Sequence, residues 1–527
     1  MYDINIMIGG TTMKKITRII SAVLCVALVA SLAALPVSAL SVAPYNSYDY
    51  DPYGGATASP LGYTPLKRVN YNDMKVVGGV SSSGVENAFN RPEDMFRYND
   101  KFFIADTGNN RIVELDSELN FVRDYTVFAS EDGSTSYDLL SPRDVFVKDD
   151  EMYVVCNRTI ADENGVNFKD GYIVVADMDG TYKRYYGKPE ADAVDFRDYE
   201  PLTVVVDNSG YLYIRALGVL EGLIILDKHG EFVQYYGANK VVMSFALAIQ
   251  VMWKKVFGRK STATTIKAVP TEMSNIFIDP EGFIYTTTST NTVAADLRLR
   301  KLNPVGDNVL AADANAIVST VYGDRSTMAG TALEDVYVDE NEMISVVDTA
   351  RSRIFIYDNR SVQLTVFGVG SEQLGGTSYP TAITKYNDYY YVLDQVDGSI
   401  TIYKPTDYMK KLLIADSYYR EGEYVKGEQY WREVLKYNSN FSIAYAAIGK
   451  SLLEKEKYQE CLAYLKYGQD RTSYSAALAE YRKEYVRDNF YWFVPLIVAC
   501  GVGLLSGISL AQSALGIKKK KQSIKFK

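Results

Sequence analysis

The chain has 527 residues, of which 47% are hydrophobic and 23% are charged. This balance is typical of a folded protein rather than a disordered one, and the length exceeds one ordinary domain. The single histidine, His229, excludes a metal site built from several histidines and disfavours a Ser-His-Asp triad.

The formal net charge of −9 is unevenly distributed along the chain. Residues 1–39 contribute +2 and residues 491–527 contribute +6, so the part between them carries −17. Phosphate binding requires clustered Lys and Arg. The acidic middle part therefore disfavours nucleic acid as a partner.

The first 39 residues have the features of a secretory signal peptide. A basic segment from Met13 to Arg18 precedes an apolar run from Ile19 to Leu35, and a small-residue cleavage signal ends at Ala39. Met1 and Met13 are both candidate starts. Residues 40–65 are rich in Tyr, Pro, Gly and Ser, and we expect them to form an extended linker.

Residues 66–405 repeat a pattern of apolar strands and polar turns. The phrase Asp106-Thr-Gly-Asn-Asn-Arg-Ile112 joins two strands, and similar phrases begin at Asp348 and Asp394. Six first strands align at intervals of 50, 59, 72, 60 and 47 residues, starting at Pro92, Pro142, Pro201, Met273, Leu333 and Pro380. Repetition at this period predicts a six-bladed β-propeller, in which a strand around Val69–Val77 completes the last blade.

The turn phrase resembles that of the NHL-repeat propeller family, best in blade one and less well in blade five. We expect a structural role for its residues, because Asp and Asn hydrogen-bond nearby backbone and tolerate left-handed geometry. These residues are Asp106, Asn109, Asn110, Arg111, Asp348 and Arg353. We expect Arg111 and Arg353 to pair with carboxylates of neighbouring blades.

A ring of polar residues is expected where the six first strands converge on the central channel. It would contain Asp94, Asp144, Asn275 and Asp335, together with Thr203, and Ala382 interrupts it. Resemblance to gluconolactonase-like propellers implies a divalent metal held by such oxygen donors, and Ca²⁺ would suit them. The alternative is that each polar residue caps the start of an inner strand and that the chain needs no cofactor.

An insert at residues 239–268 breaks the strand rhythm and is expected to be helical. Its segment Val241–Trp253 is apolar nearly all round, too short to span a bilayer and too apolar to face water. Three surfaces could cover it: the propeller's own face, a membrane partner or the bilayer interface. The candidate docking residues are Phe245, Ile249, Met252, Trp253, Lys254 and Lys255.

Residues 408–489 change to a helical pattern with a period of 34 residues. Ala415 aligns with Gly449, and Tyr424 aligns with Tyr458. This segment resembles tetratricopeptide (TPR) repeats, which implies protein or peptide docking. The alternative is a rigid spacer.

The C-terminal part is expected to anchor the chain in a membrane. Residues 490–517 are nearly uncharged and long enough to span a bilayer, and the basic tail 518–527 follows. The positive-inside rule places this tail in the cytoplasm and the rest outside, as a single-pass type I protein.

The fold class expected is therefore multidomain: an all-β six-bladed propeller, all-α TPR-like repeats and one transmembrane helix. The function expected is a non-enzymatic, extracellular scaffold at a bacterial-type cell surface, which binds a protein partner such as a membrane transporter complex. The alternative is a gluconolactonase-like or glycan-binding propeller with a divalent metal in its channel.

Overall fold

The computed structural model describes residues 43–51, 55–77, 88–161, 165–190, 198–237, 272–289, 298–310, 323 and 330–515. The expected signal peptide 1–39, helical insert 239–268 and basic tail 518–527 lie outside the described residues, so these predictions stay predictions. Residues 44–527 form one compact unit, to which the elements below belong.

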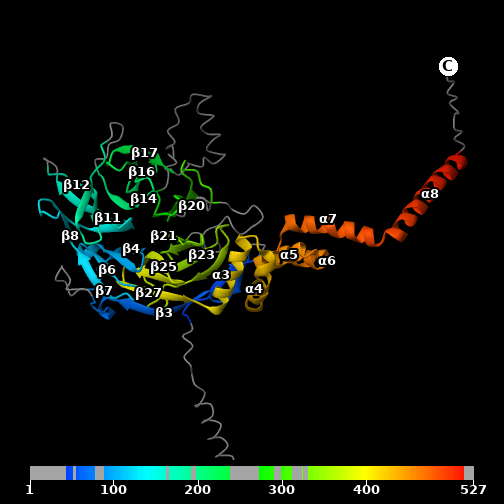
Figure 1. The fold of residues 1–527 in the computed structure, drawn as a ribbon, viewed down its shortest axis with the longest axis horizontal. Coiled ribbons are helices and arrows are strands. Elements are labelled where there is room, and N and C mark those ends of the chain that lie inside the picture. Colours follow the sequence, from blue (N-terminus) through cyan, green and yellow to red (C-terminus); the bar gives the residue numbers. More distant parts are fainter. Residues whose placement is uncertain are drawn as a thin grey trace, which may run out of the picture. The chain divides into compact units, whose positions relative to one another are not determined.

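Antiparallel sheets follow one another in chain order and form a six-bladed β-propeller (Figure 1). The first strands of consecutive blades contact one another around a closed ring, which defines them as the inner strands. The predicted number and order of blades are confirmed. Blade four has three strands within the described residues, and the other blades have four.

The strands of blades one to three are, from the inner strand outwards, β4 (Pro92–Tyr98), β5 (Lys101–Asp106), β6 (Arg111–Leu115), β7 (Phe121–Tyr125); β10 (Pro142–Lys148), β11 (Glu151–Ala161), β12 (Asn167–Asp177), β13 (Tyr182–Tyr186); β14 (Pro201–Val206), β15 (Leu212–Ala216), β16 (Leu223–Leu226) and β17 (Phe232–Tyr236). A small hairpin of β8 (Val127–Ala129) and β9 (Ser136–Asp138) lies in the connection between blades one and two.

The strands of blades four to six are, in the same order, β18 (Ile276–Ile278), β19 (Ile284–Thr287), β20 (Leu299–Leu302); β21 (Leu333–Val338), β22 (Ile344–Asp348), β23 (Arg353–Tyr357), β24 (Gln363–Phe367); β25 (Pro380–Tyr386), β26 (Tyr389–Asp394), β27 (Ser399–Pro405) and β3 (Tyr63–Asn70). Strands such as β14 are buried along their whole length because blades pack on both of their faces.

The hairpins inside the blades share one turn chemistry. In six of them the side-chain oxygen of Asp116, Asp177, Asp207, Asp227, Asp339 or Asp358 accepts the backbone N–H groups two and four residues later. The residue three positions after each Asp has a positive φ, and it is Gly after Asp177, Asp207 and Asp227. This arrangement explains why Asp-x-x-Gly occurs in the sequence at these three positions.

An N-terminal strand closes the ring. β3 pairs antiparallel with β27, with Pro405 opposite Tyr63 and Ser399 opposite Asn70. The closing strand therefore begins earlier than the expected Val69–Val77. After β3 the chain forms a 3₁₀ helix, η1 (Tyr71–Asp73), and Val76 then bridges to β7 of blade one.

The segment expected to be an extended linker contains strands. β1 (Ser47–Tyr50) and β2 (Ala56–Ser59) pair with each other, and β1 packs against β24 of blade five. Tyr45 and Tyr63 are buried against Phe367 and Tyr403. These tyrosines, which suggested a flexible linker, therefore pack their rings in the apolar core. The polar hydroxyl of Tyr45 is satisfied there because it donates to the Tyr63 carbonyl oxygen at 3.0 Å.

Six helices follow the propeller within the described residues: α3 (Asp407–Arg420), α4 (Tyr424–Tyr437), α5 (Ser442–Glu454), α6 (Tyr458–Tyr467), α7 (Arg471–Asp488) and α8 (Phe490–Ala514). Each of α3 to α6 packs on the next helix, as expected from the 34-residue period. Small residues permit this contact, because a Cβ on Gly449 would lie 2.5 Å from a methyl carbon of Leu465.

The helical region is joined to the propeller by buried polar contacts. Thr406 caps α3 by accepting the Met409 N–H, and its hydroxyl donates to the Leu61 carbonyl oxygen at 2.7 Å. Asn438, at the end of α4, donates to Asp49 of β1 at 2.6 Å. The N-terminal hairpin therefore contacts both blade five and the helices.

α8 has the length and composition of a membrane-spanning helix and is unburied within the protein. Its 25 residues would extend about 37 Å at 1.5 Å per residue, against about 30 Å for the hydrocarbon core of a bilayer. One apolar helix that could serve as a membrane anchor is therefore present.

Candidate functional site

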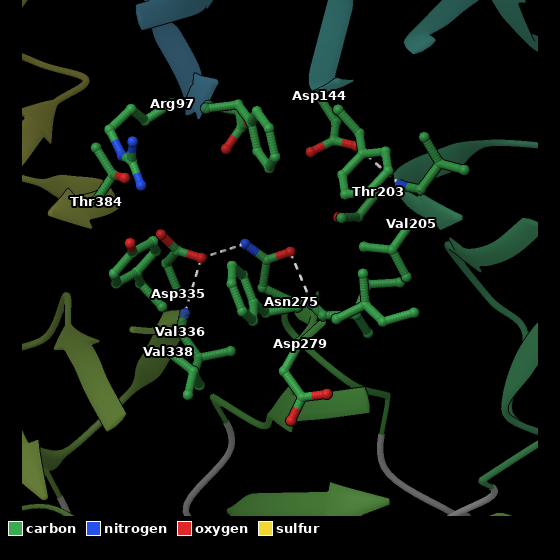
Figure 2. A pocket seen from close by; sticks show the side chains of 18 of the residues that line it. Arg97, Asp144, Thr203, Val205, Asn275, Asp279, Asp335, Val336, Val338 and Thr384 are labelled. Atoms are coloured by element: carbon green, nitrogen blue, oxygen red, sulfur yellow. Dashed lines mark hydrogen bonds between the residues drawn. The ribbon is translucent and has the colours of Figure 1, made fainter. Parts of the chain in front are cut away.

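The central channel contains a cavity of about 280 Å³ lined by the inner strands (Figure 2). In blades one, two, three and six a register shift follows the leading proline, which brings the residue two positions later to an equivalent place on each inner strand. The structure thereby brings together the four predicted ring residues Asp94, Asp144, Asn275 and Asp335, all of which line the cavity.

The polar atoms of this ring hold neighbouring blades together. The Oδ2 atom of Asp94 accepts the Val145 N–H at 3.2 Å, and the Oδ2 atom of Asp144 accepts the Val204 N–H at 2.8 Å. Each of these contacts crosses to the inner strand of the next blade. The ring therefore joins blades, and the predicted capping of inner strands is also present where Asp335 accepts the Val336 N–H and Asn275 accepts the Ile276 N–H.

Asp335 is the most fully bonded member of the ring. Its Oδ2 accepts the Ile383 N–H of blade six at 2.7 Å, and its Oδ1 accepts from the Val336 N–H and from the Asn275 side chain at 2.6 Å (Figure 2). The Asn275 Oδ1 atom in turn accepts the Ile276 N–H at 2.8 Å. This chain of bonds links blades four, five and six.

Burial makes the ring carboxyls weak acids. Burial raises the pKa of Asp94 to about 6 and raises the pKa of Asp144 well above its ordinary value, where the nearby Asp94 charge adds to the effect. Burial also raises the pKa of Asp335, with a further contribution from Asp94. The raised pKa values disfavour the charged carboxylates, which weakens the ring as a binding site for a divalent cation.

The structure brings the expected ring residues together but does not show them as ligands. Within the described part of the chain, no three His, Cys, Asp or Glu side chains are placed to hold a metal ion. The Ca²⁺ hypothesis stays a prediction. The one histidine, His229, lies in an exposed turn between β16 and β17, where its backbone N–H donates to Asp227.

A second layer of the channel was not predicted. Two residues beyond the ring, the same cavity is lined by Phe96, Phe146, Phe277 and Tyr337. Phe96 and Phe146 have ring centroids 5.1 Å apart, and Phe277 and Tyr337 have centroids 5.4 Å apart. Because side chains alternate along a strand, residues at i and i+2 face the channel together, so the ring positions already implied this aromatic layer.

The turn motif of blade one has the structural role that its residues suggested. Asp106 accepts the Asn90 N–H at 2.7 Å and the Arg111 Nε–H at 2.7 Å, and Asn109 donates to the same carboxylate at 2.8 Å. Asn110 has a φ of 54°. Arg111 pairs with Asp106 at 2.7 Å and with Asp124 at 3.3 Å, both in its own blade, and its expected pairing with a neighbouring blade stays a prediction.

Blade five repeats the motif with other partners. Asp348 accepts the Ala332 N–H at 2.8 Å and the Ala350 N–H at 3.1 Å. Arg353 lies over the ring of Tyr48 at 5.6 Å and donates to its hydroxyl at 3.3 Å. Arg353 therefore holds the N-terminal hairpin against blade five.

A groove of about 500 Å³ lies on the helical region, between α3, α4 and the end of α5. Three of its lining residues are cations, Lys426, Arg432 and Lys455, and one is an acid, Glu428. Arg432 and Lys455 pair with Glu428, whereas Lys426 pairs with Glu423. Val425 is 44% exposed at its edge. The predicted docking residues 245–255 of the insert lie outside the described residues, so the structure does not place them.

Comparisons with known proteins give no family. No protein-family model and no curated protein matches the sequence. Among solved structures, the chain is similar to virginiamycin B lyase from Staphylococcus aureus, with 8% identity, a TM-score of 0.35 and coverage of 64% of this chain and 99% of that one. It is also similar to the soluble aldose sugar dehydrogenase from Escherichia coli, with 9% identity, a TM-score of 0.33 and coverage of 60% and 96%. Similarities this low carry no conclusion about activity.

Proposed function

We propose that this protein is a non-enzymatic, membrane-anchored scaffold outside the cell, which uses its helical region to bind a protein partner. The observation that carries the proposal is the groove between α3, α4 and α5, whose lining has three cations and one acid. The resemblance of the propeller to NHL repeats and of the helices to TPR repeats supports it, because both modules commonly serve in docking.

The anchor restricts the kind of partner. α8 exposes large apolar side chains along its length, including Leu504, Leu505 and Leu510, each at least two-thirds exposed. α7 leads directly into α8, so a bilayer holds the helical region close to its surface. The partner class that fits is another membrane protein, such as a transporter component, that presents an acidic segment to Lys426, Arg432 and Lys455.

The compartment completes the proposal. The expected signal peptide 1–39 and basic tail 518–527 support an outside location for the propeller and helices and a cytoplasmic location for the tail. The insert 239–268 would provide a second dock for the same partner. These parts of the proposal rest on sequence.

The proposal is tested by chemical cross-linking of the full-length protein in its native membrane, scored by mass spectrometry. Val425→Glu places a carboxylate in the groove, where it competes with an acidic segment of the partner. We expect one stoichiometric membrane partner with the natural sequence and its loss with Val425→Glu.

Val486→Glu is the matched control, because Val486 is also an exposed helical valine, at 47% against 44%, and lies outside the groove on α7. The partner should remain with this variant. The same partner retained by both variants would remove the groove from the proposal, and a protein with no partner in any sample would contradict the scaffold function.

A further inference from the structure

A second cavity lies at the other end of the channel, where the inner strands begin. Its volume is about 270 Å³, and it shares Asp94, Asp144 and Asn275 with the ring. Its lining beyond the ring contains three arginines and two glutamates: Arg91, Arg143, Arg215, Glu93 and Glu334. A cavity so rich in charge requires an account of which charges are neutralised within the protein.

Glu93 pairs with both arginines on its side of the cavity. Its carboxylate lies 2.8 Å from a terminal nitrogen of Arg143 and 3.7 Å from one of Arg91. These three residues form an ionic cluster on blades one and two. The Glu93 carboxylate therefore already has ion-pair partners within the protein.

Arg215 and Glu334 are left without a close partner of opposite charge among the described residues. Arg215, on β15, donates to the Met273 carbonyl oxygen at 3.1 Å and approaches the Thr203 hydroxyl at 3.5 Å, and both of these acceptors are neutral. Glu334, on β21, has no side-chain hydrogen bond or ion pair within the same described part of the chain. They belong to blades three and five and line one cavity, on either side of blade four.

The two charges act on each other across the cavity without forming an ion pair. Burial lowers the pKa of Arg215, and the Glu334 charge opposes this effect. Burial raises the pKa of Glu334, and the Arg215 charge opposes that in turn. A partly buried charge without an ion-pair partner is costly, so a ligand that supplies the missing partner gains from both groups.

We propose that this cavity binds a small zwitterion of the α-amino acid class, with the ligand carboxylate on Arg215 and the ligand ammonium on Glu334. A guanidinium binds a carboxylate through two parallel hydrogen bonds, and a carboxylate accepts from an ammonium. A ligand with one charge of each sign leaves the net charge of the cavity unchanged. The volume lies near the lower limit of about 300 Å³ for ligand pockets, which suits a molecule of amino-acid size.

The test uses the detergent-solubilised full-length protein and the common L-amino acids, added one at a time at millimolar concentration. Thermal unfolding identifies the amino acids that stabilise the protein, and isothermal titration calorimetry measures their affinity. The best binder is then compared with its deaminated analogue, which keeps the carboxylate, and with its decarboxylated analogue, which keeps the amine. We expect both analogues to bind at least about tenfold more weakly.

Two substitutions locate the site. Arg215→Gln and Glu334→Gln remove one charge each, and each should weaken binding by about tenfold to a hundredfold. Arg482→Gln and Glu281→Gln make the same changes at exposed positions and should leave affinity unchanged. If Arg215→Gln does not fold, Arg215→Lys retains the charge but not the two-pronged geometry and should still weaken binding.

The proposal is overturned if no amino acid binds the natural sequence. It is also overturned if the carboxylate-only analogue binds as tightly as the amino acid, because Glu334 would then recognise nothing. Binding that survives both Arg215→Gln and Glu334→Gln would place the ligand elsewhere and would equally refute it. None of these outcomes depends on whether the helical groove binds a partner.

Discussion

The guanidinium of Arg360 lies 2.9 Å from the carboxylate of Asp416, which joins the turn between β23 and β24 to helix α3. Asp416 is fully buried and also accepts from Arg420 at 3.1 Å. Arg360 pairs with Asp358 as well and lies over the ring of Tyr419 at 4.2 Å. The junction between blade five and the helical region is thus a buried ionic cluster.

Removing the Asp416 carboxylate should loosen this junction. We expect Asp416→Ala to lower the free energy of unfolding by about 3 kcal/mol, at the low end for a broken buried pair because Arg360 keeps Asp358. Urea denaturation measures the change. Glu421→Ala, an exposed change next to α3, should stay within about 0.5 kcal/mol of the natural protein. An equally small effect of Asp416→Ala would contradict the buried junction.

The same carboxyl predicts a dependence of stability on pH. Burial raises the pKa of Asp416 to about 6, above the value of about 3.9 for an unfolded Asp. The folded state therefore binds more protons than the unfolded state between about pH 4 and about pH 6, and the contribution of this group to stability falls as the pH rises through that window. The natural protein should lose stability relative to Asp416→Asn, which does not titrate. Urea unfolding at a series of pH values measures the free energy of unfolding of both proteins. A natural protein that gained stability relative to Asp416→Asn as the pH rises would refute the assignment.

The channel ring should contribute to the stability of the propeller. Asp335→Ala leaves the buried Ile383 N–H without its acceptor and frees the Asn275 amide. At about 1–3 kcal/mol for each unsatisfied buried group, we expect a loss of about 2–4 kcal/mol in the free energy of unfolding. Thr203→Ala changes the same ring at a weakly bonded position and should cost less than half as much. Equal effects of the two substitutions would show that the blade-joining bonds are unimportant.

Calcium should not stabilise the propeller. The ring oxygens accept backbone N–H groups, and the raised pKa values of Asp94 and Asp144 disfavour the carboxylate forms that a cation needs. We expect the unfolding temperature to be the same in calcium and in a chelator. A calcium-dependent increase that disappears in Asp94→Asn would instead support the metal-holding alternative.

One glycine position should tolerate no side chain. A Cβ at Gly171 on β12 would lie 2.1 Å from the Cδ atom of Pro201 on β14, so blades two and three would have to separate. We expect Gly171→Ala to cost about 1–3 kcal/mol, as other overpacked sites do. At Gly370 the nearest atom would lie 3.7 Å away, so Gly370→Ala is the matched control. Thermal unfolding compares the two, and equal stability would contradict the close contact of the blades.

The parts of the fold that follow local chemistry could be predicted from the sequence. The strand starts at Pro92, Pro142, Pro201 and Pro380 are confirmed, because each blade repeats the same turn and strand signals. The ring positions could be aligned for the same reason. The aromatic layer of the channel, which includes Phe96 and Phe146, could also have been predicted, because side chains alternate along each strand. The strand alignment by itself pointed only to the polar positions.

What depends on distant contacts could not be predicted. The composition of residues 40–65 suggested a linker, and only their burial against Phe367 and Tyr403 makes them strands and anchors. The sequence likewise does not show that Asp106 and Asp124 lie beside Arg111. Arg215 and Glu334, separated by more than a hundred positions in the sequence, line one cavity only because blades three and five both face it.

Pairing of β3 with β27 also dictates the order in which the molecule can be completed. β3 is synthesised before any blade, while its partner strand ends at Pro405, after all six inner strands have been made. Until then β3 has no sheet to join, and blade six lacks its outer edge. The ring thus closes as a late, long-range event, slow by nature. The Asn438–Asp49 hydrogen bond can form only after α4 has been synthesised. A nascent chain that stops short of the helices therefore lacks this bond to the N-terminal hairpin.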